Sequence, residues 1–297
     1  MKHVILFIAL SSLWLQNAYS WGNAGHRDII AVAQRHLTPQ AQSIISNLLH
    51  HDLKEEAVWM DKHRTGEWAF TSQWHVLYFD KNLSYDPDPT LSVNPHTKAV
   101  EDRGDALKTI NRAVYTLSDY KHLTDSAFLF NLRCLVHMIG DMHCPVHCLI
   151  PGRTKNYASI LDEREFYPVV SVLVPVKYHN KEYISYHVLF DNMPAILFPD
   201  KTPDQVAALL DNKSKKEIRQ IIGQKAMAQY NGRYDCSLPL YRWARECAQA
   251  SMKIWDYNPD IVYDLNPSTA ELSRPMVEQE LRHAGYRLAW ILNTVLR

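Results

Sequence analysis

Glycine is scarce in this chain, with nine residues among 297, and neither sign of charge is in excess, because 32 Lys and Arg residues face 32 Asp and Glu residues. Apolar residues instead recur at helical spacing along much of the sequence, which predicts a mostly helical protein. The balanced charge excludes a global basic field that would attract polyanions. Any contact with nucleic acid must therefore be local.

Long hydrophobic runs are also missing, since no stretch reaches the ~20 residues of a membrane-spanning helix. The apolar run at residues 4–15 follows a polar start, and Ala18 and Ser20 offer small side chains at the −3 and −1 positions of a cleavage site. This pattern is typical of a secretory signal peptide and too short for a stable membrane anchor. We therefore predict a signal peptide over residues 1–20, one domain over residues 21–297, and a secreted or periplasmic protein.

Cysteine is present in small number. Five cysteines in an exported protein allow at most two disulfides and leave one thiol over. Cys236 and Cys247 are candidate partners. Cys134, Cys144 and Cys148 lie close together along the chain, and the sequence leaves their pairing open.

The segments with helical periodicity are separated by few irregular stretches. Thr38-Pro39 is a good N-cap followed by Pro at the first helical position. Residues 80–95 form a Pro-, Asp- and Asn-rich loop. The Val- and Tyr-rich residues 166–186, with His179-Asn180 as a turn, predict a β-hairpin. Without a repeat or a domain boundary, we predict an all-α single domain with a small β-hairpin. Helices are expected over residues 29–37, 41–49, 98–117, 126–142, 202–230, 238–255 and 278–296.

Histidine is abundant, with fifteen residues. His137 with Asp141, and His187 with Asp191, are each four residues apart, so each pair shares one helix face and can bind one ion. A single such pair is more often a surface ion pair or a core histidine with satisfied hydrogen bonds. Two pairs with apolar neighbours predict buried groups, which need partners or a metal. A ligand set that combines imidazole nitrogen with carboxylate oxygen and contains no cysteine thiolate favours zinc.

Further candidate ligands lie outside these pairs. Pro145 should kink its helix and could turn the next histidine toward the same ion. Signal cleavage would free the α-amine of residue 21, which can chelate a metal together with the carbonyl of the same residue. These candidates are Trp21, His26, Asp61, His75 and His147.

The ordered set of motifs resembles the S1/P1 nuclease family, zinc-dependent enzymes that cleave single-stranded nucleic acid. The resemblance covers nearly the whole of residues 21–297, and the set is far more specific than any one motif. The matching segments are Trp21-Gly22 with Gly25-His26 (family WGxxGH), Trp59-Met60-Asp61 (family Trp-Ala-Asp), Trp74-His75, residues 137–147 (family HxxGDxHQPLH), residues 187–191 (family NLHxxWD) and residues 284–293 (family AGxRLAxxLN).

The resemblance implies three zinc ions and a helical fold like that of P1 nuclease and zinc-dependent phospholipase C. It assigns the first ion to Asp61, His75, His137 and Asp141. It assigns the second ion to His147, His187 and Asp191. It assigns the third ion to the amine and carbonyl of Trp21, to His26 and to a bridging Asp141.

The same resemblance implies a hydrolase, an endonuclease that cuts single-stranded DNA or RNA to 5′-phosphate products and can act on 3′-nucleotides. A hydroxide held between two zinc ions is available near neutral pH, because the metal lowers the pKa of water from 15.7 to about 7. Asp61 would orient the attacking water. Arg64 would neutralise charge at the scissile phosphate; the alternative for Arg64 is a solvated helix cation.

The chain departs from the family at two places. No Gly-Gly-Asn precedes His187, and Val76 follows His75 where family nucleases often have an aromatic residue. Zinc binding is therefore better supported than recognition of a base. Two alternatives remain open, a zinc-dependent phospholipase C, whose last ligand pair is usually HxxxE where this chain has Asp191, and a non-catalytic exported zinc-binding protein.

Overall fold

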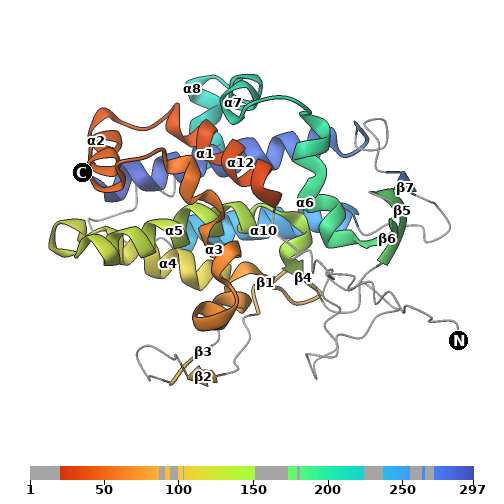
Figure 1. The fold of residues 1–297 in the computed structure, drawn as a ribbon, viewed down its shortest axis with the longest axis horizontal. Helices are drawn as coiled ribbons and strands as arrows, with labels where there is room; N and C mark the ends of the chain where they lie inside the picture. Colours follow the sequence, from red (N-terminus) through yellow and green to blue (C-terminus); the bar gives the residue numbers. More distant parts are fainter. Residues whose placement is uncertain are drawn as a thin grey trace, which may run out of the picture.

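The computed structural model describes residues 21–86, 91–93, 100–102, 104–150, 173–178, 181–223, 237–254, 263–264 and 271–297. The predicted signal peptide lies outside these ranges. The fold is mostly helical, as the sequence predicts (Figure 1). Across the described ranges, no helix combines the length and the apolar composition needed to cross a membrane.

The first half of the chain builds one side of the helical assembly. Its helices are α1 (Gly22–Gln34), α2 (Pro39–Leu49), η1 (Leu53–Val58), α3 (Trp59–His63), η2 (Gly66–His75), α4 (Ala106–Leu117), η3 (Tyr120–His122), α5 (Asp125–Met142) and η4 (Pro145–His147), where η denotes a 3₁₀-helix. α4 and α5 pack along each other, and α5 is buried over its whole last half (Figure 1).

The second half adds α6 (Tyr186–Leu197), α7 (Pro203–Leu210), α8 (Lys215–Ile222), α10 (Ser237–Ile254) and α12 (Arg274–Val295). α1 packs against α12, α7, α6 and α5, so it lies in the middle of the molecule (Figure 1). Gly285 makes the contact between α1 and α12 close, because a β-carbon there would lie 2.5 Å from Val32. α1 thereby carries its N-terminal residues into the interior.

The strands are short and lie at the periphery of the helices. β2 (Leu91–Val93) pairs antiparallel with β3 (Val100–Asp102). β5 (Leu173–Tyr178) pairs antiparallel with β6 (Lys181–Ser185) and parallel with β7 (Tyr263–Asp264). β5 and β6 correspond to the hairpin predicted over residues 166–186; its turn residues and its first residues lie outside the described ranges.

One two-stranded ladder positions the site. β1 (Leu77–Tyr78) pairs in parallel with β4 (Cys148–Leu149), with Leu77 opposite Cys148. β1 begins two residues after His75, and β4 begins directly after His147. The ladder therefore brings these two histidines together from distant parts of the sequence.

Several helix boundaries differ from the prediction, and three of the larger differences have a local reason. α1 begins at Gly22 rather than at residue 29, because its first two turns carry Gly and polar residues that hide the periodicity. α4 begins at Ala106 rather than at residue 98, because the Asp105 side chain caps it by accepting a hydrogen bond from the Lys108 amide.

The third difference is a break in the helix predicted over residues 202–230. It ends at Leu210 as α7 and restarts at Lys215 as α8. Ser214 caps α8 in a reciprocal box with Glu217, which satisfies amide groups that a continuous helix would have bonded internally. Residues 224–236 lie outside the described ranges.

Candidate metal centre

Eight of the predicted ligand side chains converge from six elements, and each is at most 3% exposed. His26 comes from α1, Asp61 from α3, His75 from the end of η2, His137 and Asp141 from α5, His147 from η4, and His187 and Asp191 from α6. Trp21, directly before α1, is fully buried as well.

The first group has the spacing of a tetrahedral site. His75 Nδ1 lies 2.8 Å from Asp141 Oδ2, 3.7 Å from Asp61 Oδ1 and 3.2 Å from His137 Nε2. His137 Nε2 lies 3.6 Å from Asp61 Oδ1 and 3.5 Å from Asp141 Oδ2. Zinc bonds of ~2.0–2.2 Å in a tetrahedron separate neighbouring ligand atoms by roughly 3.3–3.6 Å. The four side chains therefore fit one zinc ion at their centre.

The second group combines η4 with α6. His187 Nε2 lies 3.0 Å from Asp191 Oδ2, and His147 Nε2 lies 3.9 Å from Asp191 Oδ1. The two imidazole rings are 4.5 Å apart between centroids. These side chains are the three that the family resemblance assigns to a second ion.

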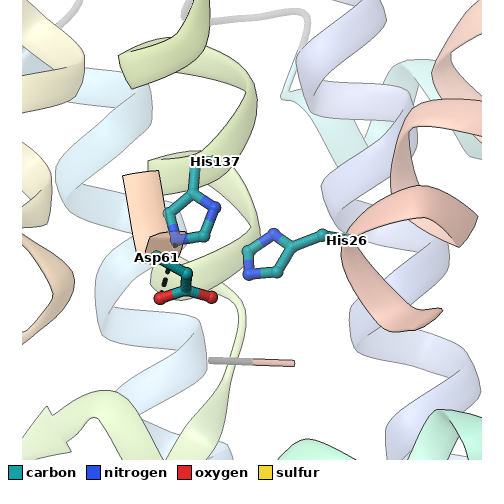
Figure 2. Close-up of side chains that lie close together, drawn as sticks. All are labelled: His26, Asp61 and His137. Atoms are coloured by element: carbon teal, nitrogen blue, oxygen red, sulfur yellow. Dashed lines mark ion pairs between the residues drawn. The ribbon is translucent and has the colours of Figure 1, made fainter. Parts of the chain in front are cut away.

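The third group joins the start of the domain to the first group through Asp141. His26 Nε2 lies 3.3 Å from Asp141 Oδ1, whereas Asp141 Oδ2 faces His75. The His26 ring stacks on the His137 ring at 4.0 Å, and Figure 2 shows His26 reaching from α1 toward Asp61 and His137. The two oxygens of one carboxylate thus face two groups of candidate ligands, which is the arrangement a bridging ligand requires.

Gly22 places the start of α1 against α6. Its φ of +31° lies in the region that favours glycine, and a β-carbon on it would come within 2.8 Å of the Asp191 carbonyl oxygen. Trp21 is also left-handed, with φ 36°. This tight approach holds the Trp21 backbone beside the second group.

Hydrogen bonds fix which nitrogen two of the histidines present. His137 Nδ1 donates to the Ala57 carbonyl at 2.7 Å, and His147 Nδ1 donates to the His75 carbonyl. A carbonyl can only accept, so Nε2 of each ring keeps its lone pair when the ring is neutral. This is the way proteins orient metal-binding histidines.

The pKa values of histidines and carboxyl groups shift in opposite directions in the first and second groups, because neighbouring charges prevail in the first and burial prevails in the second. Burial opposes a charge on His137, but the carboxylates of Asp141 and Asp61 outweigh it and raise the pKa of His137 to about 9. Burial would raise the pKa of Asp141, yet His137 and other histidines hold it well below its usual range.

In the second group burial prevails. Burial and the nearby His187 lower the pKa of His147 to about 4, and burial and Arg64 lower the pKa of His187 to about 4. Burial also raises the pKa of Asp191 well above its usual value. Both imidazoles are therefore neutral at pH 7, the state that binds metals, and a cation would relieve the buried Asp191 charge.

Several buried polar atoms of these groups have no hydrogen-bond partner within the described ranges. Each such atom costs about 1–3 kcal/mol when nothing satisfies it. A cluster of them on the candidate ligands of one centre fits bound metal better than a packed polar core. The atoms are both Asp61 oxygens, His75 Nε2, His147 Nε2, His187 Nδ1 and Asp191 Oδ2.

Two polar residues beside the site take other positions. Arg64 Nη1 lies 3.9 Å from Asp61 Oδ1, with 19% of its side chain exposed, so it borders the first group from the solvent side. His143, although it belongs to the same motif as Asp141, contacts the Ile139 carbonyl and Arg287 Nη1, at 2.7 and 2.8 Å.

The sequence interpretation missed Cys144. Its sulfur lies 3.9 Å from Asp191 Oδ1, and it forms a close group with His147 and Asp191. The available signal was its position in the central motif, where the family pattern has Gln. The four cysteines in the described ranges are free thiols. Cys247 lies against Cys148, and its predicted partner Cys236 is outside those ranges.

The mostly helical fold, with buried imidazoles and carboxylates at zinc-ligand spacing, defines a helical protein with candidate metal-binding groups. Comparison with known families makes this specific: the S1/P1 Nuclease model matches residues 21–297, so the chain belongs to that family. It is 28% identical to Nuclease S1 of Aspergillus oryzae (strain ATCC 42149 / RIB 40) over 149 residues, 48% of this chain and 50% of the relative. It is also 28% identical to Nuclease P1 of Penicillium citrinum over 134 residues, 43% of this chain and 47% of the relative. The matches thus span about half the length of these curated relatives.

Proposed function

We propose that the protein is a secreted, zinc-dependent phosphodiesterase, most specifically a nuclease for single-stranded DNA or RNA that also accepts 3′-nucleotides. The observation that carries the proposal is the first group, in which two imidazoles and two carboxylates stand at tetrahedral spacing in the interior. Family membership and the activity named in the relatives Nuclease S1 and Nuclease P1 support the substrate class.

Three zinc ions would be held by the three groups, with Asp141 shared between the first and the third. When bound, zinc supplies hydroxide near neutral pH and withdraws charge from the phosphodiester. Side chains of the protein would orient the attacking water and stabilise the charge on the phosphate. Burial would raise the pKa of Asp61, but His137 and His75 lower it below its usual value, so Asp61 is ionised and can accept a hydrogen bond from an attacking water. Arg64 would place a guanidinium beside the phosphate as negative charge develops.

We expect the purified mature protein to contain about three zinc ions per chain, because the candidate ligands fill three sites. Elemental analysis after purification without chelator measures this directly. One zinc ion or none would be incompatible with the trinuclear arrangement.

Product analysis then separates the alternatives. We expect 5′-phosphate products from single-stranded DNA and RNA, and release of phosphate from 3′-nucleotides. Cleavage of phosphatidylcholine instead would indicate a phospholipase C, and three bound zinc ions without any hydrolysis would indicate a zinc-binding protein. The Asp191 carboxylate, in place of the glutamate usual in phospholipase C, favours the nuclease.

Gly140 offers a test of the third group that does not alter a ligand. A β-carbon at Gly140 would lie 2.5 Å from His26 Nδ1, so Gly140→Ala should push the His26 ring away from Asp141. We expect the variant to lose about one zinc ion per chain and ~10–100-fold in turnover, the range typical of disturbing a metal site indirectly. Zinc content and turnover are measured on the same sample.

The matched control is Gly285→Ala. Its β-carbon would clash equally closely, at 2.5 Å, but with the apolar Val32 where α12 meets α1. We expect this variant to lose thermal stability and keep its zinc. If Gly140→Ala kept its full zinc content, the packing of the His26 ring against α5 would not be what holds His26 to an ion.

A further inference from the structure

Cys144 lies inside the candidate metal centre, between the end of α5 and η4. The residue is fully buried, and its sulfur is 3.9 Å from Asp191 Oδ1. The sulfur, one His147 nitrogen and one Asp191 oxygen all lie within 4.8 Å of one another. The backbone of Trp21 also hydrogen-bonds with this sulfur. Cys144 therefore contacts polar groups of the site as well as the apolar core around it.

The other thiols provide the contrast. Cys134 is equally buried, but its sulfur lies 3.9 Å from the thioether of Met60, as expected of a small apolar side chain. Cys148 lies against the thiol of Cys247. Among the cysteines of the described ranges, Cys144 is thus the one whose sulfur groups with a candidate histidine and carboxylate ligand.

The second group has room for this ligand. It supplies three side chains, and because zinc in proteins is usually four-coordinate, one position remains, which water fills in catalytic sites and a protein group fills in structural sites. His147 Nε2 and Asp191 Oδ2 are buried and make no hydrogen bond in the described part of the chain, so both atoms are available to bind a cation. A thiolate binds zinc at ~2.3 Å and is the soft donor that zinc accepts together with imidazole.

We propose that Cys144 is the fourth protein ligand of the second zinc ion, as a thiolate, together with His147, His187 and Asp191. The proposal rests on the proposed function, since it assumes that this group holds zinc. Binding forms a Zn–S bond and breaks the S–H bond, and the proton leaves to the solvent. No oxidant or reductant is involved.

Such a ligand changes the character of the second ion. Four protein ligands close the coordination sphere, which is typical of structural zinc, whereas catalytic zinc keeps a position for water. The thiolate also donates more charge than a water molecule would. The generation of hydroxide would then fall to the first and third ions, and the second ion would hold α6 to the end of α5.

Cobalt substitution tests the thiolate directly. We expect Co²⁺-loaded wild-type protein to show a thiolate-to-cobalt charge-transfer band in the near ultraviolet. Cys144→Ser should lose this band while keeping the visible bands of cobalt bound to imidazole and carboxylate. Cys134→Ser is the matched control, a buried thiol within α5, and should keep the charge-transfer band.

Each other outcome contradicts the inference. Bound cobalt without a charge-transfer band in the wild-type protein would exclude a thiolate ligand, whether or not any variant folds. A band that persists in Cys144→Ser, or that also disappears in Cys134→Ser, would assign it to something other than Cys144. Hydrolysis of single-stranded DNA by a protein without the band leaves the proposed function intact, whereas a protein that binds no cobalt or zinc overturns both.

Discussion

Replacing Asp141 by asparagine is expected to abolish hydrolysis of single-stranded DNA and to remove two metal ions. Asp141 Oδ2 faces His75 at 2.8 Å and Oδ1 faces His26 at 3.3 Å, so one carboxylate serves two groups. Asparagine keeps the size but loses the charge and replaces one oxygen with an amide nitrogen that cannot bind a cation. The loss should exceed the ~100-fold that follows removal of a partner outside the coordination sphere. Turnover and zinc content are the measurements.

His143→Ala is the control on the same helix. His143 is fully buried and two residues from Asp141, but it contacts Arg287 and the Ile139 carbonyl. We expect this variant to keep its zinc, lose much less activity and unfold more easily, by about 1–3 kcal/mol, because the buried Arg287 loses a partner. Equal loss of activity in both variants with zinc retained would show that the ligand assignment on α5 is wrong.

Local periodicity explains what was predictable in the fold. The spacing of four that placed His137 and Asp141 on one helix face holds in α5, where their side chains lie 3.5 Å apart. Thr38 caps α2 by accepting from the Ala41 amide, and Pro39 follows at the first position. Such signals act within one or two turns, so the sequence shows them directly.

The break between α7 and α8 shows where periodicity misleads. Apolar residues lie at helical spacing on both sides of the four polar residues 211–214, and the break depends on the Ser214 cap. The Ser214 and Glu217 box is readable in the sequence, but a cap signal inside a periodic stretch competes with the pattern around it. In this case the cap determined the structure.

The sequence predicts only in part which candidate ligands lie together. Spacing alone predicts each HxxxD pair, but nothing local shows that His26 contacts Asp141, or that His75 and His147 lie together. Those contacts come from the packing of α1 into the interior and from the β1–β4 ladder. The order of the family motifs supplied this grouping. It could not supply Cys144, because the family pattern has another residue there and the cysteines were considered as disulfide partners.

Extending the mature N-terminus is expected to reduce zinc content and turnover out of proportion to the length added. Trp21 is fully buried, its backbone hydrogen-bonds with the Cys144 sulfur, and Gly22 packs within reach of the Asp191 carbonyl. An added residue turns the α-amine of Trp21 into an amide, and an amide nitrogen is a poor metal ligand. His26 and Asp141 would then hold the third ion with too few donors.

The main comparison uses one fusion protein, assayed before and after a protease cuts it directly before Trp21. Two further proteins are assayed beside it: exported protein processed after Ser20, and cytoplasmic protein that starts Met-Trp21. We expect about one zinc ion fewer per chain and little turnover in every extended form, and recovery of both when the fusion is cut and zinc is added. A disordered N-terminus would tolerate the extension. Equal zinc content and equal turnover in all forms would refute the role of Trp21 as a ligand.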